Sequence, residues 1–191
     1  MRKIILASTS PRRKEIFAKT GLSFEVQASP YKEDMSLDMS PIKLSEHLSF
    51  EKAKAVVEKN QDAIIIAADS FVVCDNKYLG KPKTKEEAKE MLKMLSGKEH
   101  EIFTGVSIID SKDNRSVSFH ETIKVFMKKL SPETIDRYIK TGEPMDKAGA
   151  YAIQGIGAVL IEKIEGDFFA AMGLPLSRLS EELKSFGIDI L

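Results

Sequence analysis

Hydrophobic and polar positions along the chain fall into blocks that predict both strands and helices. The longest apolar run, AIIIAADSFVVC at residues 63–74, favours a central strand that is buried on both faces. Two strand-like segments, 101–110 and 116–127, flank the turn-rich sequence SKDNR and predict an antiparallel hairpin. Shorter apolar runs predict three further strands, at residues 3–7, 24–28 and 158–164.

Helices are predicted where a capping residue precedes a segment with helical spacing. Ser-Pro pairs mark three such starts, because serine caps a helix and proline suits its first position. Thr84 and Glu87 form a capping box at a fourth start. The predicted helices cover about residues 11–19, 41–59, 84–96, 132–142 and 174–186. This mixture of βα units with one hairpin predicts an α/β fold with a mixed sheet covered by helices.

The size and charge of the chain narrow the class of protein. A chain of 191 residues is most naturally one domain, covering residues 1–191. Its 29 basic and 29 acidic residues cancel, whereas a protein that coats nucleic acid would carry a positive field. We therefore expect no nucleic-acid partner, and any site for an anion must be local.

Cys74 is the single cysteine, which excludes an internal disulfide framework and a multi-cysteine zinc site. The apolar run near the N-terminus is too short for the core of a signal peptide, and no stretch approaches the length of a membrane span. We expect a protein of the reducing cytoplasm that has no membrane segment.

The segment STSPRR, residues 8–13, places Arg12 and Arg13 in the first turn of a predicted helix. That end of a helix already carries partial positive charge and unpaired N–H groups, so two guanidinium groups there are unfavourable on their own. A bound anion would relieve the repulsion. The segment therefore predicts a phosphate site.

Two acidic residues are candidates for chemistry. Asp69 lies inside the apolar run, where an ionised carboxylate needs a cation or hydrogen bonds to compensate it. It either accepts hydrogen bonds from a neighbouring loop or acts as a metal ligand or general base at a strand end. Glu33, in an acidic irregular loop, is either a second carboxylate for Mg²⁺ or simply a solvated side chain.

Polar side chains elsewhere extend this set. Lys52 and Lys54 lie on adjacent directions of a predicted helix, so only one of them should face a given cleft. Lys81, between a glycine and a proline, has a constrained backbone. The amide of Gln154 offers the donors and acceptors that a nucleobase requires, or else caps a loop. The histidines are scattered without ligand spacing and are assigned no role: His47, His100 and His120.

Several segments together resemble the Maf family of nucleotide pyrophosphatases, also named septum formation inhibitors. They follow the family's order over nearly the whole chain and read ILASTSPRRKEI, EKAKAV, AADS, LGKP, LSGKEHEIFTGVSI, EPMDKAGAYAIQG and IEGDFFAAMGLPLSRL. The resemblance implies a mixed twisted β-sheet flanked by helices with a deep cleft, an architecture related to the inosine triphosphate pyrophosphatases. It also implies a homodimer.

The resemblance further implies that the protein hydrolyses a nucleoside triphosphate between the α and β phosphates, with Mg²⁺ or Mn²⁺ as cofactor. Matched position by position, the family's catalytic residues correspond to Asp69, Lys52 and Lys81, and its metal ligands to Glu33 and Asp69. Its substrate-binding residues correspond to Ser8, Ser10, Arg12, Arg13, Ser70 and Gln154. Whether Asp69 is the general base or only a metal ligand is left open.

Gln154 and Ser70 are similar to the branch of the family that acts on dTTP and UTP. That branch usually has threonine at the position of Ser70, and the 7-methyl-GTP branch tends to have glutamine there. Pyrimidine triphosphates are therefore the expected substrates. The alternatives are a pyrophosphatase for 7-methyl-GTP or another purine nucleotide, and a non-catalytic nucleotide-binding regulator of septum formation.

Overall fold

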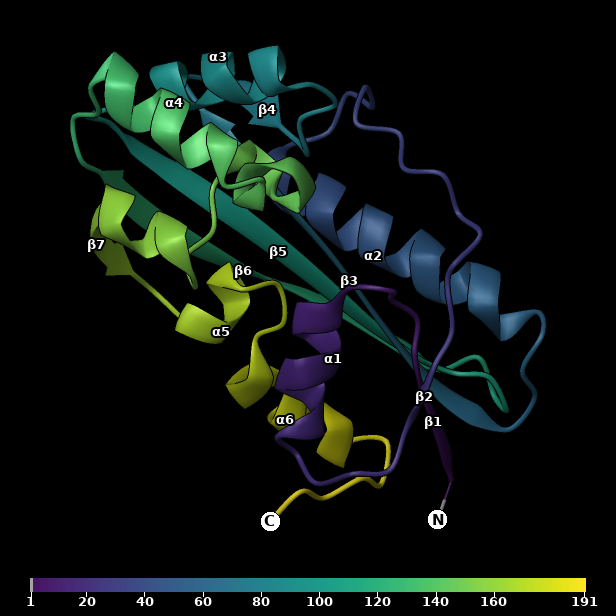
Figure 1. Ribbon diagram of the computed structural model, residues 1–191. Coiled ribbons are helices and arrows are strands. Elements are labelled where there is room, and N and C mark those ends of the chain that lie inside the picture. The colour runs from purple at the N-terminus through teal and green to yellow at the C-terminus, as the bar shows by residue number, and fades with distance from the viewer. Residues whose placement is uncertain (1) are drawn as a thin grey trace. The chain divides into compact units, whose positions relative to one another are not determined.

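The computed structural model describes residues 2–191, and Figure 1 shows its helices and strands. In this part of the chain the strands form a seven-stranded sheet in the order β2-β1-β3-β5-β6-β7, with β4 paired to β3. The strands are β1 (Lys3–Leu6), β2 (Glu25–Val26), β3 (Ala63–Cys74), β4 (Lys77–Leu79), β5 (Glu99–Asp110), β6 (Ser116–Met127) and β7 (Ile161–Glu165). Strand β1 is parallel to both β2 and β3, whereas β4 is antiparallel to β3 and β7 to β6. The predicted mixed sheet is confirmed.

Helices of two kinds connect these strands. The α-helices are α1 (Pro11–Ala18), α2 (Pro41–Val57), α3 (Lys85–Leu95), α4 (Pro132–Lys140), α5 (Phe168–Ala171) and α6 (Leu176–Lys184). Three short 3₁₀ helices follow α4, namely η1 (Glu143–Asp146), η2 (Ala148–Ala150) and η3 (Ile156–Leu160). No helix within residues 2–191 has both the length and the apolar character needed to cross a membrane.

The described chain divides into two compact units. The first comprises residues 2–69, Thr104–Glu121 and Met172–Leu191, and the second comprises Ser70–Phe103 and Thr122–Ala171. The division falls inside β3, β5 and β6, so the peptide bond from Asp69 to Ser70 joins one unit to the other. The single domain predicted for residues 1–191 stays a prediction.

The core of the first unit lies between α2 and the sheet. Ala53 and Val56 of α2 pack against apolar side chains of β1, β3 and β5, including Ile5 and Ile65. The helix approaches β5 most closely at Gly105, where an added Cβ would lie 2.1 Å from the backbone oxygen of Ser45. Glycine at this position therefore lets the helix backbone rest directly on the strand.

The core of the second unit lies under α3 and α4, which run side by side in Figure 1. Leu92 of α3 and Tyr138 of α4 join one buried cluster with side chains of β3 to β6. Tyr151 and Ile153 of the segment between η2 and η3 belong to the same cluster. This segment is therefore attached to the core at two positions.

Most of the predicted elements are confirmed, including the residue limits of β3. The hydroxyl groups of Ser10, Ser40, Thr84 and Ser131 each cap a helix as expected. The hairpin is also confirmed, since β5 and β6 are neighbours and the amide of Asp110 donates to the carbonyl of Arg115.

The prediction was wrong for four elements. Strand β7 begins at Ile161 instead of residue 158, because residues 156–160 form η3. Helix α6 begins at Leu176 instead of residue 174, after Pro175 in extended conformation. The pattern also missed α5 and β4, which have four and three residues. Asp75 and Asn76, with φ of 48° and 61°, form the tight turn that leads into β4.

Candidate active site

The candidate site of the first unit lies where the parallel pairing of β1, β2 and β3 ends. Leu6 pairs with Val26 on one side and with Ile66 on the other, so the three strands run in step. The STSPRR sequence follows β1 and the Glu33 loop follows β2. Asp69 lies inside β3, just beyond its last pair with β1, and not at a strand end as expected. Ligands gather in this region of α/β sheets, and here it brings together residues far apart in the sequence.

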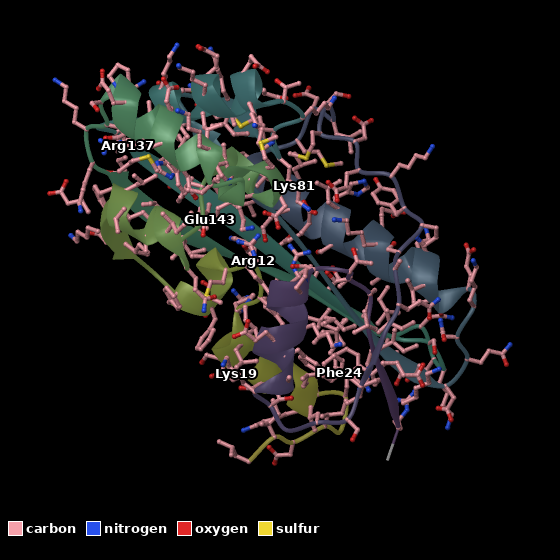
Figure 2. All side chains as sticks on the ribbon, in the orientation of Figure 1. Arg12, Lys19, Phe24, Lys81, Arg137 and Glu143 are labelled. Atoms are coloured by element: carbon pink, nitrogen blue, oxygen red, sulfur yellow. The ribbon has the colours of Figure 1, made fainter. Side chains whose placement is uncertain are left out.

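Helix α1 directs its N-terminus toward this region. The Ser10 hydroxyl accepts a hydrogen bond from the amide of Arg13 at 3.5 Å, and no acidic residue lies in the first turn. Figure 2 shows Arg12 at the beginning of α1 and Lys19 at its opposite end. The predicted conflict is therefore present, since two cations lie at the positive end of the helix without a carboxylate in that turn.

Arg13 is held by two neighbours. Its Nε donates to the carbonyl oxygen of Gly173 at 2.8 Å, and its Nη1 donates to the Ser8 hydroxyl at 3.5 Å. The same hydroxyl accepts the amide of Ser10 at 3.3 Å. Ser8 and Ser10 therefore stabilise the turn before α1, and Ser8 also orients the Arg13 side chain.

Burial makes the charged form of the Arg13 side chain unfavourable in free energy. Burial lowers the pKa of its guanidinium, and the charge of Arg12 lowers it further, while the carboxylates of Asp69 and Glu33 oppose the shift. Arginine nevertheless stays protonated in proteins. A bound anion would therefore stabilise this position strongly.

Lys52 is the unusual residue of α2. The buried face of the helix repeats every fourth residue through Leu44, Leu48, Lys52 and Val56, so a lysine stands in a row of apolar side chains. Its side chain is 11% exposed, whereas that of Lys54 is 60% exposed. The prediction that only one of the two lysines faces a cleft is consistent with this difference.

The ammonium group of Lys52 binds two carboxylates. Its Nζ donates to Glu33 Oε1 at 2.5 Å and also to Asp69 Oδ1. Asp69 is almost completely buried, with 6% of its side chain exposed, and Glu33 is half exposed. A cation therefore compensates the buried Asp69, as its position in an apolar strand requires.

More negative charge surrounds this pair. Burial raises the pKa of the Tyr31 hydroxyl, and the charges of Glu51, Asp34, Asp69 and Glu33 raise it further. Lys54 pairs with Glu51, but Lys52 alone pairs with both Asp69 and Glu33. Additional positive charge would therefore be favourable here.

The donor set suits a metal ion that is shared with a substrate. Among residues 2–191 no cluster of three or more histidine, cysteine or acidic side chains could hold a metal by itself. Asp69 and Glu33 supply two carboxylates that meet at one ammonium group. Mg²⁺ is typically bound by one or two carboxylates together with waters and substrate phosphates.

The remaining candidates, Ser70, Lys81 and Gln154, belong to the second unit and are described within that unit. Ser70 follows Asp69 in β3 and is half-buried. Lys81, labelled in Figure 2, is exposed, and the residues beside it are held, because Gly80 accepts the amide of Gly149 at 3.0 Å and Pro82 is buried. The expectation of a constrained backbone at Lys81 is consistent with these contacts.

Gln154 is exposed at the turn between η2 and η3, with the buried Ile153 before it. Sequence reasoning missed the side chain that organises this turn, Glu143, which accepts the amides of Ile156 and Gly157. The only signal for Glu143 in the sequence was its position in EPMDKAGAYAIQG, one of the segments that resemble the Maf family. An acidic residue after a helix-ending glycine is otherwise an ordinary surface residue.

Comparison with known proteins places the whole chain. Residues 3–186 match the family model described as Maf-like protein. The chain is 48% identical over 190 residues to a protein of Bacillus anthracis named dTTP/UTP pyrophosphatase, covering 100% of this chain and 98% of that one. A protein of the same name from Bacillus thuringiensis subsp. konkukian has the same identity and coverage.

A solved structure shows the fold independently. The HAM1 protein of Coxiella burnetii aligns with a TM-score of 0.57 at 14% identity, covering 97% of this chain and 100% of that one. The expected fold class, a mixed sheet flanked by helices, is confirmed.

Proposed function

Because the chain belongs to the Maf family, we propose that it is a nucleoside triphosphate pyrophosphatase acting on dTTP and UTP. The products are the nucleoside monophosphate and pyrophosphate. One observation carries the proposal beyond the family relation: a buried Lys52–Asp69 pair with Glu33, on the same unit as a helix N-terminus that bears two arginines.

The first unit offers the groups that a triphosphate requires. Arg12 and Arg13 supply positive charge, and they lie at the N-terminus of α1, where the helix dipole also favours an anion. Phosphate oxygens would relieve the repulsion between the two guanidinium groups. Arg13 is already oriented by Gly173 and Ser8, so little conformational entropy is lost when it binds.

We propose that Asp69 and Glu33 hold a Mg²⁺ or Mn²⁺ ion together with the phosphates. When bound, such an ion supplies charge neutralisation at the anhydride and lowers the pKa of a water bound to it. The two carboxylates are the observation in favour, because they already share one cation and lie in acidic surroundings.

We propose that Asp69 handles the attacking water. Its carboxylate either takes the proton of that water or fixes the water's orientation, while the anhydride bond between the α and β phosphates breaks and pyrophosphate departs. Lys52 holds Asp69 and Glu33 in place by donating to both.

The second unit carries the residues proposed to complete phosphate binding and to read the base. By the family match, Lys81 binds phosphate, and Ser70 and Gln154 contribute to selectivity. A pocket built to hydrogen-bond a base rejects the wrong base because its polar groups are then left unpaired.

The cytoplasm remains the proposed location, and the buried unpaired thiol of Cys74 is consistent with a reducing compartment. The homodimer stays a prediction.

A panel of nucleoside triphosphates with pyrophosphate detection tests the proposal. Purified protein should release pyrophosphate from dTTP and UTP, should lose activity with a chelator and should recover it with Mg²⁺ or Mn²⁺. Preference for 7-methyl-GTP or another purine triphosphate would move the protein to another branch of the family. Nucleotide binding without metal-stimulated hydrolysis would favour the regulator.

A further inference from the structure

The turn that carries Gln154 is built around one carboxylate. Glu143, labelled in Figure 2 and half-buried at the start of η1, accepts three hydrogen bonds within the second unit. Ile156 N donates to its Oε1 at 2.9 Å, and Gly157 N and the Tyr138 hydroxyl each donate to its Oε2 at 2.7 Å. The side chain thereby gathers two successive backbone amides on the C-terminal side of Gln154.

Tyr138 extends this anchor to the other side of Gln154. Its hydroxyl donates to Glu143 and accepts the amide of Ala152 at 3.0 Å. Backbone amides on both sides of Gln154 are therefore connected to one carboxylate, directly or through one hydroxyl. Between these amides, Gln154 and Gly155 are exposed, whereas Ile153 is buried.

The two glycines of the turn are fitted to the same carboxylate. A Cβ at Gly155, where φ is 110°, would lie 2.2 Å from Glu143 Oε1. A Cβ at Gly157 would lie 2.5 Å from both the Tyr138 hydroxyl and the carbonyl oxygen of Ala152. The glycines allow the backbone to wrap closely around Glu143, which gives a physical reason for the spacing of the sequence QGIG.

The charge of Glu143 suits this role. Burial alone would raise its pKa, but the hydrogen bonds from Tyr138, Gly157 and Ile156 and the charge of Lys147 lower the pKa overall. The group is therefore an anion at neutral pH and acts only as an acceptor. A neutral amide in its place has a nitrogen that cannot accept, so at least one of the three donors would lose its partner.

We propose that Glu143 is a positioning residue that fixes the turn of Gln154 and thereby determines how strongly the enzyme prefers pyrimidine triphosphates. The inference rests on the proposed function, because it assigns Glu143 to the base-reading residue of that reaction. Glu143 itself need not contact the nucleotide. It acts through the backbone on either side of Gln154.

The test compares Glu143→Gln with Gln154→Ala and with the double variant. Glu143→Gln should raise KM for dTTP and UTP about tenfold while kcat stays within about twofold, because a misplaced base-reading side chain weakens binding without touching the phosphates. Its preference over purine triphosphates should fall to that of Gln154→Ala. The double variant should be no worse than Gln154→Ala, because residues that act through one another are not additive.

A readout without substrate accompanies the kinetics. The amides of Ile156 and Gly157 should exchange hydrogen about tenfold faster in Glu143→Gln than in the wild type. Tyr138→Phe keeps the packing of the ring and removes the hydroxyl, so it should shift selectivity in the same direction even if Glu143→Gln folds poorly. Glu162→Gln makes the same chemical change at an exposed position of β7 and should alter neither quantity.

The outcomes separate the two proposals. Wild-type protein that is inactive toward dTTP and UTP overturns the proposed function itself. Active wild-type protein with unchanged amide exchange and unchanged selectivity in Glu143→Gln overturns the role of Glu143 alone. The same holds if the effects of Glu143→Gln and Gln154→Ala multiply in the double variant, because Glu143 would then act independently of Gln154.

Discussion

The ammonium group of Lys52 and the carboxylate of Asp69 form an ion pair in a row of apolar residues, where each would be costly alone. Pairs of this kind are seldom retained for stability, since well-packed apolar residues often serve as well. Two predictions therefore separate the contribution of this pair to folding from its contribution to catalysis.

Asp69→Asn should abolish turnover and leave the fold intact. The amide keeps the size of the side chain and one acceptor for Lys52, but it cannot take a proton from water or bind a metal well. We expect pyrophosphate release to fall at least about 100-fold and the free energy of unfolding to fall by about 1–3 kcal/mol. Enzyme assay and denaturant unfolding measure the two effects, and near-normal activity would contradict the assignment.

Lys52→Met should destabilise the protein, because it leaves Asp69 buried without its cation. A loss of about 3–5 kcal/mol is expected. The double variant Lys52→Met/Asp69→Leu replaces the pair with apolar side chains and should return to within about 1 kcal/mol of the wild type, while remaining inactive. Recovery of activity together with stability would show that the pair is structural only.

Arg12 and Arg13 should give different results when each is replaced by alanine. Arg13, directed by Gly173 and Ser8, should mainly serve the phosphates, so its loss should weaken binding of all triphosphates about equally. Loss of Arg12 should in addition change the ratio of pyrimidine to purine activity. Lys14→Ala, on the exposed face of the same helix, is the matched control and should change neither. Identical substrate profiles for the two arginine variants would contradict this difference in role between Arg12 and Arg13.

His100 should make stability fall as the pH decreases below neutrality. The ring is buried and its Nε2 lies 2.7 Å from the Tyr151 hydroxyl, and burial lowers its pKa to about 4. The unfolded chain, with a histidine pKa near 6.5, takes up the proton first, so stability is full above about pH 6.5 and is lost as the pH falls toward 4.

The shift corresponds to about 3 kcal/mol at most. Urea unfolding between pH 7 and pH 4.5 measures it. His100→Gln should flatten the pH dependence in this window, whereas the half-exposed His47→Gln should preserve it. An unchanged slope in His100→Gln would assign the effect to other groups.

The sequence predicted those elements of the fold that are determined by residues adjacent in the chain. Caps at Ser10 and Thr84 and the apolar run of β3 depend on neighbouring residues, so their limits were predicted within a few positions. Strand β4 and helix α5 were missed because elements this short carry almost no periodic pattern.

The candidate site was predicted in its residue types, and the contacts came from the structure. The need of Asp69 for a partner could be inferred from its apolar surroundings, but the choice of Lys52 depends on how α2 lies over β3. Glu143 could not be inferred, because it bonds residues 156 and 157 across a connection that no local rule describes.

The close approach of α2 to β5 at Gly105 has a consequence for mutant screens. Any side chain at this position meets the carbonyl of Ser45, so α2 has to lift from β5. Lys52 lies two turns further along the same helix and would move with it. A random search for loss-of-function alleles should therefore recover substitutions of this glycine, although it has no side chain and is not among the residues assigned to catalysis.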